Sequence, residues 1–401
     1  MSNTLVTCSI VAKEALAILE NMLGFAANVN RDWSDEFSGN QSRGYSPGQT
    51  ILIKRPPRYT YRAGRVSVPQ ATTEVTVPLV LQQGGTDLNF TGLERTVSVQ
   101  QFEQKVQAAV ATVANEIDRQ GLDVARLNAF NTIGTPGVLP NTQLLALQAV
   151  TGVNQRLDEM GAPRDKQRAF IMNPALNGAA VVGFAGMFNS QDKLAKQFGS
   201  GMMVDSLGLA YAMDQNVAVH TNGSQAVTGT AVAAGLLGSS IAVAALTGNI
   251  TRGTKISFPG VFAVNPQSRQ NTGTLAQFVV TADLLTGATA LPISPAIIPS
   301  GAFQNVTSAT TAANFTIFGA ASGVYAASVA YHRDAFTLAM VPMFAPPQGK
   351  GIVDVSVQST QGLSVKVTQF YDGVNDNYIL RLDVLFGWAA TYPELAVLYA
   401  T

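Results

Sequence analysis

The side chains that could carry acid–base or metal chemistry are few and scattered in this chain of 401 residues. The sequence contains two histidines, His220 and His332, and one cysteine, Cys8. Neither histidine lies in the His-Glu-x-x-His pattern of a zinc protease. A single cysteine excludes an intrachain disulfide and a cluster of thiolate ligands. We therefore expect no catalytic residue, no metal site, no cofactor and no enzymatic activity.

Two segments imitate ligand-binding motifs but do not complete them. Residues 248–255 resemble a phosphate loop, yet Thr254 interrupts the Gly-Lys-Ser/Thr order that positions the lysine and the magnesium ligand. Residues 372–377 are rich in oxygen ligands, but they lack the alternate acidic positions and the final glutamate of a calcium loop. We interpret this second segment as a hairpin turn. The run at 332–334 is assigned a structural role, because neighbouring residues of a strand point to opposite faces.

A cluster of charges of one sign lies between residues 37 and 73, which include six basic side chains and no acidic one. The basic residues are Arg43, Lys54, Arg55, Arg58, Arg62 and Arg65, with Tyr59 and Tyr61 interleaved. Three interpretations remain open: binding of single-stranded nucleic acid through phosphate contacts and stacking, a solvated hairpin, and a loop that meets acidic residues of a neighbouring subunit. The whole chain has 25 basic and 25 acidic residues, and this neutrality favours the third interpretation.

Strands must position this basic segment. Residues 50–53 and 66–68 have strand character, and Pro56-Pro57 together with Gly64 predicts a long hairpin between them. Alternating apolar residues predict a further strand over 73–81. The basic segment is therefore expected to form a hairpin over about residues 43–65.

A long amphipathic helix is predicted from Ser98 to about Arg126. Ser98 begins a capping box with Gln101, and apolar residues then recur at helical spacing. The helix also carries the carboxylates of Glu103, Glu116 and Asp118. We hypothesise that these acidic residues pair with arginines on the hairpin of a neighbouring subunit, namely Arg55, Arg58, Arg62 and Arg65.

The other patterns predict a mixture of helices and antiparallel strands, an α+β fold class. Helices are expected at residues 5–23, 142–160 and 175–188, with a short buried strand at 169–172 and strands and turns over 199–219. Alternating apolar residues at 353–357, 363–367 and 378–386 predict long hairpins near the end of the chain.

Between Gln215 and His332 the chain is almost free of charge. Its only charged residues are Arg252, Lys255, Arg269 and Asp283. Glycine and proline punctuate short apolar runs there, which is typical of compact β structure with tight turns, so we predict an inserted β module. In the whole chain 12% of residues are charged, about half the usual quarter, which favours burial of surface against other subunits.

No feature of the sequence indicates a membrane span or export. The longest apolar stretch, 231–246, is interrupted by glycine and serine and is shorter than the ~20 residues that a bilayer requires. The first residues lack the basic region and long apolar core of a signal peptide. A reducing cytoplasm suits the single cysteine.

Several short motifs occur in a characteristic order. They are GAP at 161–163 with Arg168 and NP at 173–174, LTGNITRGTKISF at 246–258, AYHRDAF at 330–336, GLSV at 362–365, RLDVLFG at 381–387 and PELA at 393–396. In this order the chain resembles, over nearly its whole length, the P-twenty-two-like coat proteins of short-tailed double-stranded DNA phages. The resemblance implies the Hong Kong 97-type capsid fold.

The same resemblance implies a domain organisation. An N-terminal arm would occupy 1–34, an extended E-loop 35–76, a P-domain 77–138 and 347–401 with its spine helix at 98–126, an A-domain 139–222 and 326–346, and an inserted β-barrel I-domain 223–325. In this family a loop of the I-domain makes charged contacts between capsomers. Residues 226–245 carry no charge here, so such a loop must be short or must act through apolar contacts.

The function implied by the resemblance is that of a major capsid protein. Copies would form the pentamers and hexamers of an icosahedral shell around packaged double-stranded DNA, assembled in the host bacterial cytoplasm with a scaffolding protein and a portal protein and without a membrane. A separate scaffolding protein is expected because no long coiled-coil segment precedes the arm. Two alternatives stay open: a nucleic-acid-binding protein that uses the 43–65 hairpin, and a β-rich decoration protein or adhesin.

Overall fold

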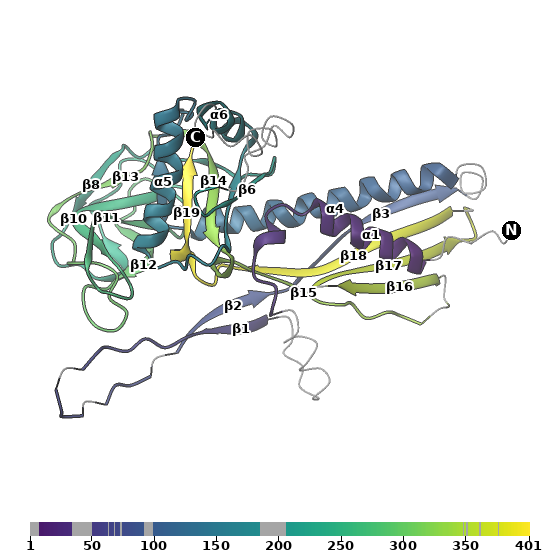
Figure 1. The fold of residues 1–401 in the computed structure, drawn as a ribbon, viewed down its shortest axis with the longest axis horizontal. Coiled ribbons are helices and arrows are strands. Elements are labelled where there is room, and N and C mark those ends of the chain that lie inside the picture. The colour runs from purple at the N-terminus through teal and green to yellow at the C-terminus, as the bar shows by residue number, and fades with distance from the viewer. Residues whose placement is uncertain are drawn as a thin grey trace. The chain divides into compact units, whose positions relative to one another are not determined.

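Long α-helices and several β-sheets make up the chain, as the mixed helix and strand patterns predict (Figure 1). The computed structural model describes residues 8–33, 50–62, 64–67, 69–72, 74–91, 99–184, 206–347, 349, 352–360, 362–375 and 377–401. Two compact units can be distinguished. The first consists of Met1–Ile53, Val77–Gly121 and Phe336–Ala389, and the second of Lys54–Thr76, Leu122–Ala335 and Ala390–Thr401.

An antiparallel sheet in the order β15-β18-β17-β16 forms the base of the first unit. Its strands are β15 (Thr337–Met340), β16 (Ile352–Thr360), β17 (Leu363–Asp372) and β18 (Asn377–Ala389), and β3 (Gln82–Thr91) also pairs with β18. The three alternating runs near the end of the sequence are therefore strands, as predicted. Asp372 lies opposite Asn377 at the end of the β17–β18 ladder, which confirms the predicted hairpin turn.

Two helices lie along this sheet (Figure 1). α1 (Cys8–Met22) packs on β16 and β17 through a buried apolar stripe, and η1 (Ala26–Asn28) follows it. α4 (Val99–Asn128) is the long helix predicted from the sequence, although Ser98 and its capping box lie outside the described residues. Trp388 of β18 donates its indole N–H to the carbonyl of Ile117 at 3.1 Å. This bond fixes α4 against the sheet.

A mixed sheet in the order β4-β19-β14-β5-β6 lies in the second unit. Its strands are β4 (Asn131–Gly134), β5 (Arg168–Met172), β6 (Ala210–Met213), β14 (Val324–His332) and β19 (Ala396–Ala400), with β7 (Val219–Thr221) paired to β14. α5 (Gln143–Glu159) and α6 (Pro174–Phe184) pack together, and a buried core joins them to the sheet. Thr142 caps α5 by accepting the N–H of Leu145.

A second sheet of this unit closes on itself. Its order is β8-β13-β10-β11-β12-β9, and a bridge between Val232 and Val243 connects the two outer strands. The strands are β8 (Thr228–Val232), β9 (Gly238–Ala242), β10 (Lys255–Val264), β11 (Asn271–Val280), β12 (Ala290–Ile297) and β13 (Ala313–Ile317). Phe258, Phe278 and Phe315 pack inside it. Most of the low-charge stretch thus forms a compact β-barrel, in agreement with the β module that its composition predicts.

Some expectations differ from the structure. Val66 and Ser67 are not in a strand; instead β1 (Thr50–Arg55) pairs with β2 (Val75–Val80), because the intervening residues are rich in proline and glycine. α6 ends at Phe184, and residues 185–205 lie outside the described part of the chain. Where the structure describes the chain, no helix is both long enough and apolar enough to cross a bilayer.

Gly121 on α4 allows a close approach that a larger residue would prevent. A Cβ at this position would lie 2.5 Å from the Trp388 ring and 2.8 Å from the Phe25 ring. We expect Gly121→Ala to lower the free energy of unfolding by roughly 1–3 kcal/mol, because the clash outweighs the ~1 kcal/mol by which alanine normally favours a helix. Thermal and denaturant unfolding of the purified protein measure this change.

Gly178→Ala on α6 is the matched control, since nothing lies within 4 Å of its added Cβ. We expect this second variant to be as stable as the wild type or slightly more stable. A Gly121→Ala protein that is stabilised like Gly178→Ala would contradict the close packing of α4 on Trp388.

Candidate functional site

One carboxylate holds the base of the basic hairpin. Glu394, in η3 (Pro393–Leu395), accepts a hydrogen bond from Arg58 Nη2 at 3.1 Å, and Arg55 Nη2 lies 3.6 Å from its other oxygen. The guanidinium of Arg55 lies over the ring of Tyr392, and that of Arg58 over the ring of Phe303. The Glu394 side chain is only 15% exposed, so these pairs are less screened than surface pairs. We call Glu394, Arg55 and Arg58 the Glu394 clamp.

Side chains, not a strand ladder, join the two arms of the hairpin beyond this clamp. Gln70 accepts the N–H of Thr60 at 2.8 Å and donates to the carbonyl of the same residue at 2.7 Å. The hydroxyls of Tyr59 and Thr72 lie 2.9 Å apart. The amide of Gln70 therefore satisfies the backbone groups that a paired strand would otherwise satisfy.

The remaining hairpin arginines lie near the tip. Arg62 donates to the backbone carbonyls of Gly64 and Val66, and Arg65 is exposed. Tyr61 is 93% exposed. The four arginines of the predicted contact thus divide into two that bind Glu394 of the same chain and two at the exposed tip.

Glu116 and Asp118, two of the acidic residues proposed as partners of these arginines, already have different partners within the chain. Glu116 binds Arg119 through two hydrogen bonds of 2.8 and 2.6 Å, and this arginine lowers the pKa of Glu116. Asp118 is buried and accepts the backbone N–H groups of Gly24 and Ala26 at 2.7 and 2.9 Å. Asp118 therefore caps the segment that follows α1.

The predicted pairing of arginines with Glu103, Glu116 and Asp118 of a neighbouring subunit stays a prediction. The side chain of Glu103 lies outside what the structure describes. Both oxygens of Asp118 are occupied within the chain. Glu394 is not among the predicted site residues, and its position in the PELA motif is the sequence signal that points to it.

A buried lysine joins the barrel to the end of α4. Lys255, the first residue of β10, is 1% exposed and donates from Nζ to the carbonyl of Arg126 at 2.7 Å. Burial, together with the nearby charge of Arg126, lowers the pKa of Lys255 well below its usual value. The carbonyl belongs to the last turn of α4, where cations are favoured. Lys255 is one of only four charged residues in the low-charge stretch, and this scarcity is the sequence signal for the contact.

His220 completes the same junction. Its Nδ1 lies 2.8 Å from Arg126 Nη1 and must accept that hydrogen bond, since arginine only donates. Its Nε2 lies 3.3 Å from Thr254 Oγ1. Burial, followed by the charges of Lys255 and Arg126, lowers the pKa of His220 to about 3. The imidazole is therefore neutral at physiological pH.

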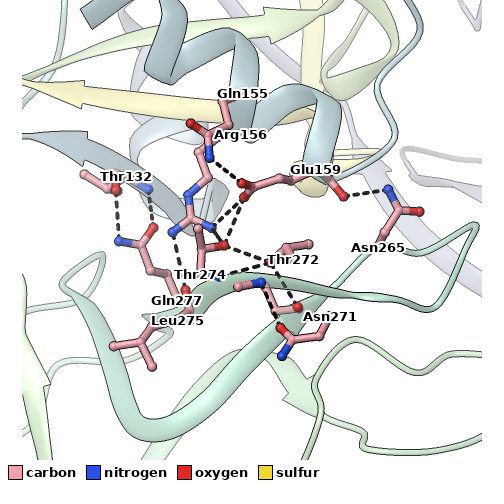
Figure 2. A network of polar contacts seen from close by, with 12 residues as sticks. Thr132, Gln155, Arg156, Glu159, Asn265, Asn271, Thr272, Thr274, Leu275 and Gln277 are labelled. Carbon is pink, nitrogen blue, oxygen red and sulfur yellow. Dashed lines mark hydrogen bonds and ion pairs between the residues drawn. The ribbon is translucent and has the colours of Figure 1, made fainter. Parts of the chain in front are cut away.

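A polar seam connects α5 to the barrel (Figure 2). Arg156 of α5 donates to Glu159 at 3.2 Å and to Thr274 of β11 at 2.6 Å, and Thr274 donates to Glu159 at 3.0 Å. Further along β11, Gln277 exchanges two hydrogen bonds with the backbone of Thr132 on β4. These neutral and charged bonds hold the barrel against the mixed sheet and its helix, and composition alone did not indicate them.

His332 lies beside two carboxylates, an arrangement that strand alternation does not predict. Its Nε2 lies 3.1 Å from Asp165, and its Nδ1 lies 3.6 Å from Asp334. The strand ends at His332, and η2 (Arg333–Ala335) turns Asp334 back toward it, so strand alternation does not apply. Among the described residues, no group of three or more His, Cys, Asp or Glu is placed to hold a metal ion.

Comparison with known proteins identifies the class. A family model described as "P22 coat protein - gene protein 5" matches residues 86–398. No curated protein matched the chain. The match covers the low-charge barrel, α4 and the sheets on either side of the barrel in sequence, whereas α1, β1, β2 and the hairpin lie before it.

The solved structures to which the chain is similar include several from phages. One from Mycobacterium phage Che8 is 13% identical, with 94% of this chain and 90% of the other covered and a TM-score of 0.48. The capsid of Ralstonia phage GP4 is 8% identical, with 89% and 84% covered and a TM-score of 0.44. The capsid of Myoviridae phage XM1 is 7% identical, with 96% and 91% covered and a TM-score of 0.41. Because these scores are below 0.5, the assignment follows from the family match.

The protein is thus a structural component of a viral capsid. The chain belongs to the P22 coat protein family, which confirms the resemblance given by its motifs. It is a major capsid protein of a tailed bacteriophage.

Acid should weaken the junction at His220. The histidine has a pKa of 6.5 when unfolded and about 3 when folded, so the unfolded chain binds more protons between these values. The free energy of unfolding must therefore fall as the pH is lowered from 6.5 toward 3, by about 2 kcal/mol between pH 7 and pH 5. Denaturant unfolding at pH 7, 6 and 5 measures the loss. His220→Gln, which keeps an acceptor for Arg126, should show a smaller loss; equal losses would contradict this account.

Removing the shared carboxylate should loosen the hairpin. In Glu394→Gln both Arg55 and Arg58 lose their anionic partner, so we expect trypsin to cleave after Arg58, Arg62 and Arg65 roughly fivefold faster, corresponding to about 1 kcal/mol. Gel analysis of timed digests measures the rate. Glu74→Gln is the matched control, because its pair with Lys54 is more than half exposed. The clamp is refuted if both variants are cleaved at the wild-type rate.

Proposed function

We propose that copies of this chain assemble as pentamers and hexamers into an icosahedral shell that encloses packaged double-stranded DNA. The coat-protein match carries this proposal, since it extends from β3 to β19. The low charged fraction of 12% is consistent with a subunit that covers much of its surface with other copies.

The Hong Kong 97-type architecture is part of the proposal. The N-terminal arm would be 1–34, the E-loop 35–76, the P-domain 77–138 and 347–401, the A-domain 139–222 and 326–346, and the I-domain 223–325. The long helix α4 supports the spine-helix assignment, and the closed barrel supports the I-domain. β4 and β19 pair with each other, and β19 also pairs with β14, which favours placing both strands with the A-domain instead of the P-domain.

Assembly would take place in the host bacterial cytoplasm, with a scaffolding protein and a portal protein as partners. The loop between β8 and β9 spans only 233–237 and is tied to Thr310, which accepts the N–H groups of Gly235 and Leu236. A loop this short and uncharged supports a shell that lacks a charged I-domain contact between capsomers.

The hairpin tip is the proposed contact between subunits. Arg55 and Arg58 bind Glu394 of their own chain, so Arg62 and Arg65 remain as the better candidates to meet Glu103 or Glu116 of a neighbour. Each exposed pair contributes only ~0–1 kcal/mol, so the shell would rely on many repeated contacts.

Electron microscopy of the protein, expressed with and without its scaffolding partner, tests both parts of this proposal. We expect closed shells from the wild type. Arg62→Glu combined with Arg65→Glu should leave folded, unassembled subunits, because like charges then face each other. Adding Glu103→Arg and Glu116→Arg to that variant should restore shells.

The possible outcomes separate the function from the contact. Shells that form normally from the Arg62→Glu, Arg65→Glu variant would refute the pairing but not the function. If the wild type forms no shell under either condition while remaining folded, the assembly function itself is wrong.

A further inference from the structure

A cavity of about 600 Å³ lies in the second unit beside the Glu394 clamp. Its walls come from the base of the hairpin, from the barrel and from the segment before β19. Large apolar side chains form much of the wall, including Pro57, Phe130, Met160, Phe278, Phe303 and Tyr392. Both the volume and the mainly apolar wall are typical of small-molecule sites.

The charge at the cavity wall is not balanced. Of the described residues that line it, the charged ones are Arg55, Arg58 and Glu394. Two guanidinium groups therefore share one carboxylate, and one positive charge remains. The Nε of Arg55 is buried and has no hydrogen-bond partner. A ligand that offers a negatively charged acceptor would relieve both deficits.

A second buried donor that lines the cavity comes from the mixed sheet. Asn131 of β4 lines the cavity, is 1% exposed, and has no partner for its Nδ2. A buried amide without an acceptor is costly, and native structures contain few of them. The cavity thus combines an apolar wall, two donors without acceptors and one excess positive charge.

We propose that this cavity binds an amphiphilic monocarboxylate, a medium-length alkyl chain or aromatic ring that ends in a carboxylate. The apolar body fills the space between Phe278 and Phe303, and the carboxylate oxygens accept from Arg55 and Asn131. Such a ligand contacts both the hairpin base and the barrel, so it stabilises the packing of the hairpin base against the barrel. The proposal does not depend on the assembly function.

Binding of octanoate to the purified full-length protein tests the proposal. We expect octanoate to bind in a ligand-observed NMR titration and to raise the thermal unfolding midpoint. Octanol and octylamine, which have the same chain length, should bind at least roughly tenfold more weakly, because they lack the charged acceptor. No octanoate binding, or equal binding of the three ligands, would overturn the proposal.

Variants locate the site. Ala296→Phe should abolish binding by filling the cavity from the barrel side, where Ala296 is partly exposed and the fold can accept a larger residue. Asn131→Leu and Arg58→Gln should each weaken octanoate binding by roughly tenfold. Arg252→Gln makes the same charge change on an exposed residue that does not line the cavity, so it should bind like the wild type. Unchanged binding in Ala296→Phe, or equal weakening in Arg252→Gln, refutes this site.

Discussion

The hydrogen bond from Lys255 to the carbonyl of Arg126 is the contact on which the second unit depends. A buried ammonium group is tolerated only where it is neutralised or fully hydrogen-bonded, so its partner cannot be exchanged freely. The bond connects the first residue of the barrel to the last turn of α4. His220 and Tyr325 face each other on the paired strands through which the chain enters and leaves the barrel, and their rings lie 5.4 Å apart. The inserted module is therefore attached where its two connections converge.

Scarcity of charge shapes the other contacts of this unit. Between Gln215 and His332 only Arg252, Lys255, Arg269 and Asp283 are charged, so the barrel must be fixed mainly by neutral groups. The polar seam supplies these neutral groups. The hydroxyl of Thr274 accepts a hydrogen bond from Arg156, and the side-chain amide of Gln277 bonds both the N–H and the carbonyl of Thr132. A hydrogen bond from an amide side chain to an unpaired backbone group adds little net energy, but its loss would leave a buried group unsatisfied.

The hairpin shows how one basic segment serves two purposes. Its base is fixed inside the chain because the carboxylate of Glu394 is shielded and flanked by aromatic rings. Its tip is organised by Gln70 and Arg62 and remains exposed. The clamped base fixes the position of the exposed tip, which suits the contact between subunits that we propose for Arg62 and Arg65.

Local patterns in the sequence predicted the helices α1, α4, α5 and α6, the strands β1, β2, β5, β16, β17 and β18, and the inserted β module, because period and turn residues depend only on near neighbours. The order of short motifs predicted the coat-protein family. The sequence could not show that Glu394 binds Arg55 and Arg58, that Asp118 caps the segment after α1, or that Lys255 is buried. Those pairs are separated by about a hundred residues or more. The identity of a charged residue does not reveal whether its side chain faces water or a buried partner. Only the tertiary structure, which decides where water is excluded, determines which charges are available to another subunit.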